Sequence, residues 1–214
     1  MVEFSLWDIF TFLLGALRWT VGLSLIAFVG GGLVGLGLML LRFAKLPGAS
    51  AAVAWYVQLF QGTPLLMQLF LVYFGLALFG LDTSPLVAAA LCLTLYTSAY
   101  LTEIWRGCVA AVPQGQWEAG SSLALTYTQQ MRHVILPQAA RVAIAPTVGF
   151  LVQVIKGTAL ASVIGFVELT KAGQMISNAT YQPLLAYACV GLLYFVLCFP
   201  LSWWSQRLEK RHHT

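Results

Sequence analysis

Polar and ionisable side chains interrupt three long apolar stretches of this sequence. An ionisable group near the centre of a lipid bilayer costs roughly 2.5 to 3.5 kcal/mol on insertion scales, so the groups that are retained there usually pack inward or line a wet cavity. Such side chains could line a pathway for a small polar solute, or they could bond to neighbouring helices and hold a bundle together. The candidates are Gln58, Gln61, Thr63, Gln68, Tyr96, Tyr100, Glu103, Gln153 and Lys156.

The first of these stretches combines glutamines with a break in the helical pattern. Gln58, Gln61 and Gln68 fall on one face of a helix, and the Gly-Thr-Pro segment at residues 62–64 interrupts the run between them. Because proline lacks a backbone donor and clashes with the preceding turn, it kinks a helix. The sequence therefore predicts a kinked helix with a polar face.

The other two stretches each carry an ionisable residue. Tyr96, Tyr100 and Glu103 follow the i, i+4, i+7 spacing of one helical face, and Gln153 shares a face with Lys156. We expect Lys156 to lie in the interior or beside a lumen, and one hypothesis is that Glu103 neutralises it. The alternative is that Glu103 pairs with the next cation one helical turn away, Arg106.

Glycine and small polar residues form two further patterns with a structural meaning. Gly30, Gly32 and Gly35 match a dinucleotide-binding spacing, but they lie inside an apolar run and not between a strand and a helix. Gly31 and Gly35 instead predict a smooth face for close helix packing. A separate face of the helix that holds Glu103 is also suited to packing, and it consists of Thr94, Thr97 and Ser98.

Neither nucleotide nor metal chemistry is indicated. The sequence has no GxxxxGK[ST] loop, so ATP would have to be handled by a partner. The four cysteines show no metal-ligand spacing and are interpreted as structural. We therefore expect a protein that is not itself an enzyme and binds no cofactor.

Composition identifies the environment of these residues. Of 214 residues, 60% are hydrophobic and 8% are charged, whereas soluble domains carry about 25% charged residues. The net charge is +4, but the cations form no basic stripe, which argues against a nucleic-acid partner. We predict an all-α membrane protein, a single bundle over residues 1–214 with five spans at residues 11–41, 49–79, 85–105, 139–164 and 183–204.

The distribution of cations predicts the orientation in the membrane. Eight of the eleven Lys and Arg residues lie in three segments, at residues 42–45, 106–141 and 207–211. The positive-inside rule places these segments in the cytoplasm, with the N-terminus outside and the C-terminus inside. The first span lacks the cationic start of a signal peptide and is expected to be retained.

The cytoplasmic connection at about residues 106–140 is long enough to hold structure of its own. A short helix is predicted at residues 117–123, and Thr126 with Gln129 matches a capping box that starts a second one. Pro137 can then lie in the first turn of the next helix.

This connection resembles the cytoplasmic signature of permease subunits of ATP-binding-cassette importers, in the branch that takes up polar amino acids. That signature is Glu-Ala-Ala, three residues, Gly, nine residues, Ile, one residue and Leu-Pro. Here its spacing is kept by Glu118, Ala119, Gly120, Ala124, Val134, Leu136 and Pro137. Gly120 stands at the second alanine, Val134 at the isoleucine and Ala124 at the glycine; the last change matters most, because glycine eases a tight turn.

Other segments resemble the same family. Residues 62–66 are similar to its RGTPLL segment with Gln61 at the arginine, and residues 99–104 are similar to AYLAEI. Residues 163–170 resemble SVIGxxELT, and residues 156–160 resemble KDTSL without the acidic residue. The motifs together cover about residues 60 to 170.

The resemblance implies a mechanism and a set of partners. Two permease subunits, identical or paralogous, would form the pathway in a bacterial inner membrane. Each would dock a coupling helix on a subunit of a cytoplasmic ATPase dimer that uses ATP and Mg, and a solute-binding protein would deliver an amino acid to the outer face. An ATP-independent secondary transporter or channel for small polar solutes is the alternative, and the glutamines do not decide which amino acid is carried.

Overall fold

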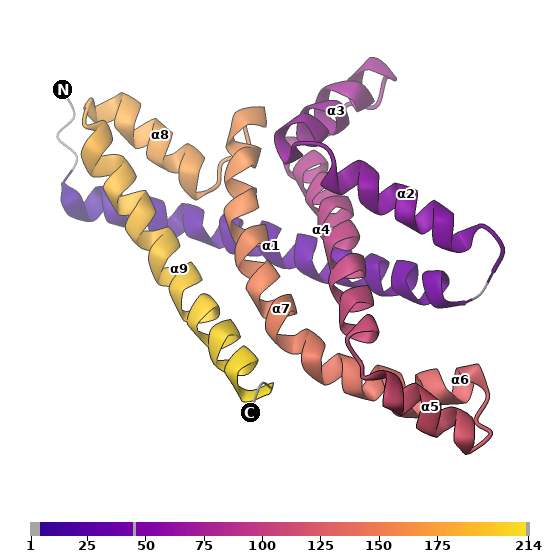
Figure 1. Ribbon diagram of the computed structural model, residues 1–214. Helices are drawn as coiled ribbons and strands as arrows, with labels where there is room; N and C mark the ends of the chain where they lie inside the picture. Colours follow the sequence, from indigo (N-terminus) through magenta and orange to yellow (C-terminus); the bar gives the residue numbers. More distant parts are fainter. Residues whose placement is uncertain (1–4, 45, 213–214) are drawn as a thin grey trace.

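The computed structural model describes residues 5–44 and 46–212, and all regular secondary structure in this part of the chain is helical (Figure 1). This confirms the predicted all-α class. The elements in order are α1 (Leu6–Phe43), α2 (Ala49–Gln61), α3 (Leu65–Leu78), α4 (Pro85–Ala110), α5 (Gln114–Ser122), α6 (Tyr127–Gln130), η1 (Met131–Ile135), α7 (Leu136–Gly157), η2 (Thr158–Ile164), α8 (Leu169–Thr180) and α9 (Pro183–His212).

Four helical segments of the described chain are long and apolar enough to cross a membrane. They are α1, α4, the helical run Tyr127–Ile164, and α9; α2 and α3 together pass the same test as a fifth, broken span. This agrees with the prediction of about five spans. The helices extend beyond the apolar runs where polar residues support them, as at the start of α1, where Ser5 and Asp8 form a capping box.

The second span is broken more sharply than predicted. The axes of α2 and α3 differ by 99° across residues 62–64, so this segment is two helices and not one kinked helix. Proline begins the second helix as its N-cap, where its missing N–H is tolerated.

Helices α1 and α4 cross in close contact, and the crossing uses the small residues that the sequence singled out. A Cβ atom on Gly31 would lie 2.5 Å from the Thr97 side chain, and one on Gly35 would lie 2.9 Å from the Ser98 carbonyl oxygen. Thr102 Oγ1 donates to the Gly35 carbonyl at 3.1 Å. The prediction of a smooth packing face is therefore confirmed.

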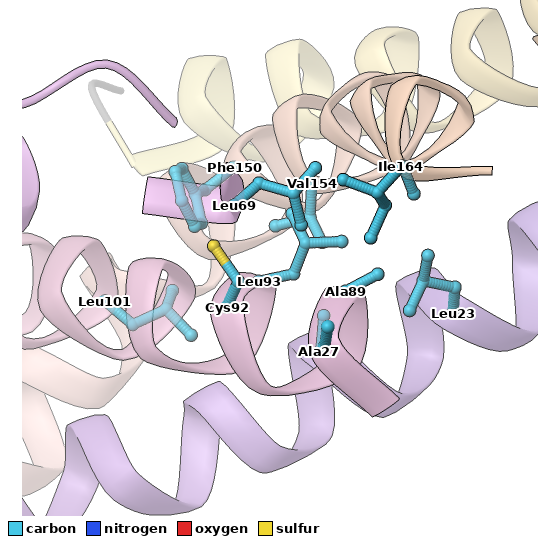
Figure 2. Packing of buried hydrophobic residues seen from close by; sticks show 12 residues of the cluster. Leu23, Ala27, Leu69, Ala89, Cys92, Leu93, Leu101, Phe150, Val154 and Ile164 are labelled. Carbon is cyan, nitrogen blue, oxygen red and sulfur yellow. The ribbon is translucent and has the colours of Figure 1, made fainter. Parts of the chain in front are cut away.

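The main apolar core surrounds this crossing. Leu23 and Ala27 of α1 lie beside Ala89 of α4, while Phe150 and Val154 of α7 lie on the other side of the cluster (Figure 2). All of these side chains are less than 10% exposed. The core thus ties α1, α4 and α7 together and fixes the ends of these helices relative to one another.

The two ends of the molecule carry different short helices. Figure 1 shows α5 and α6 beyond the ends of α4 and α7, and α8 at the far end, near the start of α1. The sequence did not predict α8, because residues 165–182 contain no long apolar run. Its helix is amphipathic, with Leu169, Ala172 and Ile176 buried.

Candidate functional site

The connection between α4 and α7 folds into a pair of short helices, α5 and α6, which we call the coupling hairpin (residues 114–130). The predicted capping box of α6 is confirmed: Gln129 N donates to Thr126 Oγ1 at 3.4 Å, and Thr126 N donates to Gln129 Oε1 at 2.9 Å. The rings of Trp117 and Tyr127 stack with their centroids 6.3 Å apart. The hairpin is thus held by contacts between its two helices.

A buried glutamine between the two helices of the hairpin connects them by hydrogen bonds. Gln130 is 7% exposed, and its Nε2 donates to Ser121 Oγ and to the Leu125 carbonyl, both at 3.1 Å. Its side chain lies over Gly120, where a Cβ atom would approach Gln130 Cγ to 2.9 Å. Glycine at position 120 therefore makes room for the glutamine.

The turn between the two helices places a non-glycine residue in the left-handed region. Ala124 has φ 54°. Leu125 N donates to the Gly120 carbonyl at 3.1 Å and Ala124 N to the Ser121 carbonyl at 2.9 Å, which is a Schellman motif with Ala124 at C′. Glycine is usual at this position because it has no Cβ to strain. The sequence predicted that Ala124, in place of the family glycine, affects a tight turn. The structure shows how: Ala124 adopts the left-handed conformation in the turn between α5 and α6.

Ala124→Gly is expected to stabilise the hairpin by about 1 kcal/mol, because the left-handed conformation strains a residue with a Cβ. Amide hydrogen exchange in α5 and α6 should slow roughly fivefold. Ala119→Gly is the matched control: Ala119 is an exposed residue within α5, so glycine there should destabilise the helix by roughly 0.5–1 kcal/mol. Faster exchange in Ala124→Gly would contradict the strain.

The hairpin continues without interruption into the fourth span. Helix α6, the π-helical turn η1 and α7 form one helical run, in which Leu136 N donates to the Met131 carbonyl. Pro137 explains the widened turn, because it has no N–H and its ring would clash with the carbonyl four residues earlier. The fourth span therefore begins before residue 139, the boundary expected from hydropathy.

An apolar cluster also joins the hairpin to α4. Cys108 and Val109 of α4 are buried against Met131 and Ile135 of η1, and Trp117 packs on the same cluster. Among the signature residues, Glu118, Ala119, Ala124 and Pro137 are exposed, Gly120 is buried, and Val134 and Leu136 are half-buried. One face of α5 is therefore exposed, while its other face packs against α4 and the start of the fourth span.

Two side chains replace backbone donors at the break of the second span. Pro64 cannot donate to the Phe60 carbonyl, and Gln68 Nε2 does so instead at 2.8 Å. Thr63 Oγ1 donates to the Leu59 carbonyl at 2.7 Å. Because unsatisfied backbone groups are costly inside a bilayer, these bonds allow the chain to bend there.

The glutamines of the second span have different surroundings. Gln58, Gln61 and Thr63 are exposed, whereas Gln68 is 7% exposed. The prediction that three glutamines share one face is therefore wrong, since the break turns Gln68 inward. Gln68 Oε1 has no hydrogen-bond partner within the described residues.

The candidates on α4 and α7 form an aromatic group and an exposed polar pair. Tyr96, Tyr100 and Phe150 stack, with centroids 4.5 Å apart for the two tyrosines and 5.2 Å apart for Tyr100 and Phe150. Gln153 and Lys156 are exposed on α7. Tyr96 and Tyr100 are half-buried against the apolar core, so the exposed side chains of this group are Gln153 and Lys156.

Glu103 bridges two arginines, and the hypothesis that it neutralises Lys156 is wrong. Its Oε2 accepts from Arg42 Nη1 at 3.1 Å, and its Oε1 accepts from Arg106. The alternative pairing with Arg106 is confirmed. The reason is position: Glu103 lies near the end of α4, beside the last turn of α1 and the start of the helical run that contains α7, whereas Lys156 lies in the last turn of α7.

A fully buried carboxylate lies at the other end of the molecule. Glu168 is fully buried as the N-cap of α8 and accepts hydrogen bonds from the backbone of Thr170 and Lys171 and from Tyr194 Oη, each at 2.9 Å. Burial raises the pKa of Glu168, and these hydrogen bonds oppose the shift. The sequence signal for this role is an acidic residue just before an amphipathic helix.

Known proteins share both the sequence and this arrangement. Residues 47–213 match the family described as binding-protein-dependent transport system inner membrane component. The chain is 34% identical to the L-cystine transport system permease protein TcyB of Bacillus subtilis, over 99% of this chain and 89% of that protein. It is 32% identical to the glutamine transport system permease protein GlnP of Escherichia coli, over 97% and 95%.

Two solved structures share the fold. A chain from the crystal structure of an amino acid ABC transporter with histidines superposes with a TM-score of 0.92 and 32% identity, over 99% of both chains. A chain of the inward-facing MetNI methionine ABC transporter gives a TM-score of 0.75 at 21% identity and supports the fold alone.

Proposed function

Because the chain belongs to the family of binding-protein-dependent transport system inner membrane components, we propose that it forms the translocation pathway of an importer for polar amino acids together with a second permease subunit. The relatives are permease subunits of ABC transporters. ATP hydrolysis with Mg would take place in a separate ATPase dimer, so this chain would not act as an enzyme.

The coupling hairpin is the observation that carries this proposal. It places Glu118 and Ala119 on an exposed helix, α5, which packs against α6 at the start of the continuous helical run that leads into α7. A force applied to α5 by an ATPase subunit would therefore reach the fourth span without crossing a flexible linker. An ATP-independent channel would have no use for such a connection.

The exposed polar residues of the spans support a pathway between two subunits. Gln58, Gln61, Gln153 and Lys156 face outward from this single chain, and polar groups at membrane depth are costly against lipid. A second permease subunit with a wet pathway between the two would give them a polar environment. Tyr96 and Tyr100 would add an aromatic wall.

The charge pattern supports one orientation. The coupling hairpin and the end of α9 would lie in the cytoplasm and the N-terminus outside. The end that carries α8 would then receive the solute-binding protein.

Reconstitution tests the proposal. The permease and its ATPase subunit are placed in proteoliposomes with ATP inside, and uptake of a panel of radiolabelled amino acids is measured with and without the binding protein. Uptake is expected only with both ATP and binding protein. Uptake without ATP would identify a channel or secondary transporter instead.

A further inference from the structure

A cavity beside the coupling hairpin brings together several groups that bind anions. Its volume is about 280 Å³, and Arg42, Ser50, Arg106 and Trp117 are among its lining residues. It therefore lies where α1 ends, α2 begins and α5 passes the end of α4. The volume is roughly nine times the share of one water molecule in the liquid, so a phosphate group fits with part of the molecule that carries it.

The two arginines keep most of their hydrogen-bond donors. Arg42 uses Nη1 and Arg106 uses Nε and Nη2 to bind Glu103. A guanidinium has five N–H donors, and neither side chain makes another hydrogen bond within the part of the chain that the structure describes. Two guanidinium charges against one carboxylate leave this cluster with a net charge of +1.

The start of α2 adds donors of a different kind. Its N-cap is Gly48, which has no side chain to cap the helix. The backbone N–H groups of Ser50 and Ala51 have no partner among the described residues. Free N–H groups and the positive end of the helix dipole make a helix N-terminus a phosphate-binding element. The hydroxyl of Ser50 lies at the same cavity.

The surroundings of the cavity identify the source of the phosphate. Leu41 and Leu46, on either side of Arg42 in the sequence, are 39% and 56% exposed and can contact acyl chains. Trp117, from the hairpin, is the type of residue that lies at headgroup depth. A cationic site between spanning helices on the cytoplasmic side suits an anionic lipid.

We propose that this cavity binds the phosphate of an anionic phospholipid from the cytoplasmic leaflet. The lipid would contact α1, α2, α4 and the coupling hairpin at once, and its charge would therefore influence how firmly the hairpin is held against the spans. This proposal rests on the proposed function in one respect: the orientation given there places the cavity on the cytoplasmic side of the membrane.

Native mass spectrometry of the full-length protein with its ATPase subunit tests this. The complex is supplied with phosphatidylglycerol or phosphatidylcholine, and the lipid retained after mild activation is counted. Phosphatidylglycerol should be retained in preference. Arg42→Gln and Arg106→Gln should each lower its retention roughly tenfold, the effect of losing a charge-assisted hydrogen bond.

Glu103→Gln separates lipid binding from a merely structural role of the ion pairs. It raises the local charge while leaving both arginines in place, so phosphatidylglycerol retention should rise. If the ion pairs serve only stability, this variant will lose lipid as the arginine variants do, which overturns the proposal. Arg132→Gln, which removes an exposed cation of η1 outside the cavity, is the control and should change nothing.

Two further measurements test whether the cavity binds something other than a lipid. Displacement of the lipid by millimolar inorganic phosphate would assign the cavity to a free anion, and loss of the ATPase subunit from Arg42→Gln with unchanged lipid retention would assign it to a protein contact. Either result, or equal retention of the two lipids, overturns the proposal. Lipid retention is also measured on the permease that carries no ATPase subunit. If no ATPase subunit binds, that result therefore counts against the proposed function and not against this lipid site.

Discussion

Gly31→Leu is expected to prevent the helices of the bundle from assembling. Any Cβ at this position would lie 2.5 Å from Thr97 and 3.0 Å from the Thr94 carbonyl oxygen, so α1 and α4 would have to separate. Overpacking typically costs about 1–3 kcal/mol, and a clash with a backbone oxygen as well as a side chain places this change at the upper end or beyond. We expect loss of the monodisperse protein in size-exclusion chromatography and a large drop in thermal stability in detergent.

The same helix offers a matched control. Gly37 has no neighbouring atom within 4 Å of where its Cβ would lie, so Gly37→Leu should be tolerated or slightly stabilising. Combining Gly31→Ala with Thr97→Gly should recover part of the stability that Gly31→Ala alone loses, because the clashing side chain is gone. Equal stability of Gly31→Leu and Gly37→Leu would show that the close crossing is not required.

Glu118→Lys should leave the protein in the membrane but lower recovery of the ATPase subunit at least roughly tenfold, a loss of about 1.4 kcal/mol in binding. Glu118 is exposed on α5, and its side chain makes no hydrogen bond or ion pair within the described residues, so the change should not disturb the fold. Reversal of charge at a docking surface removes any favourable contact and adds repulsion. Co-purification from membranes, scaled to the amount of permease, measures the effect.

Glu209→Lys is the control for this charge reversal. Glu209 is also exposed, near the end of α9, and lies outside the coupling hairpin. It should leave recovery of the ATPase subunit unchanged. If both variants behave alike, the effect comes from net charge and α5 is not the docking element.

The sequence predicted those features that depend on nearby residues. Runs of apolar side chains predicted the spans, and the Thr126–Gln129 spacing predicted the start of α6 because a capping box is local. The packing role of Gly31 was predicted because small residues four apart make a smooth helix face. These signals need no knowledge of the tertiary structure.

Features that depend on contacts between distant segments were predicted poorly. The carboxylate of Glu103 has one partner on its own helix, which was foreseen, and a second, Arg42, that lies 61 residues away in the sequence. The inward turn of Gln68 follows from the 99° break, whose size no residue pattern specifies. Helix α8 was missed because its stability comes from packing one face on α9 and α1 and not from apolar length.

The contact between Gly120 and Gln130 should be visible as covariation of these two positions among homologous sequences. A methyl group at position 120, which the family signature carries, would collide with the glutamine as it lies here. Homologous chains with alanine at that position should therefore have a shorter or differently oriented residue opposite it, and the two positions should change together. Correlated substitution at this pair would mean that the two residues are replaced together, so that the packing between α5 and α6 is kept.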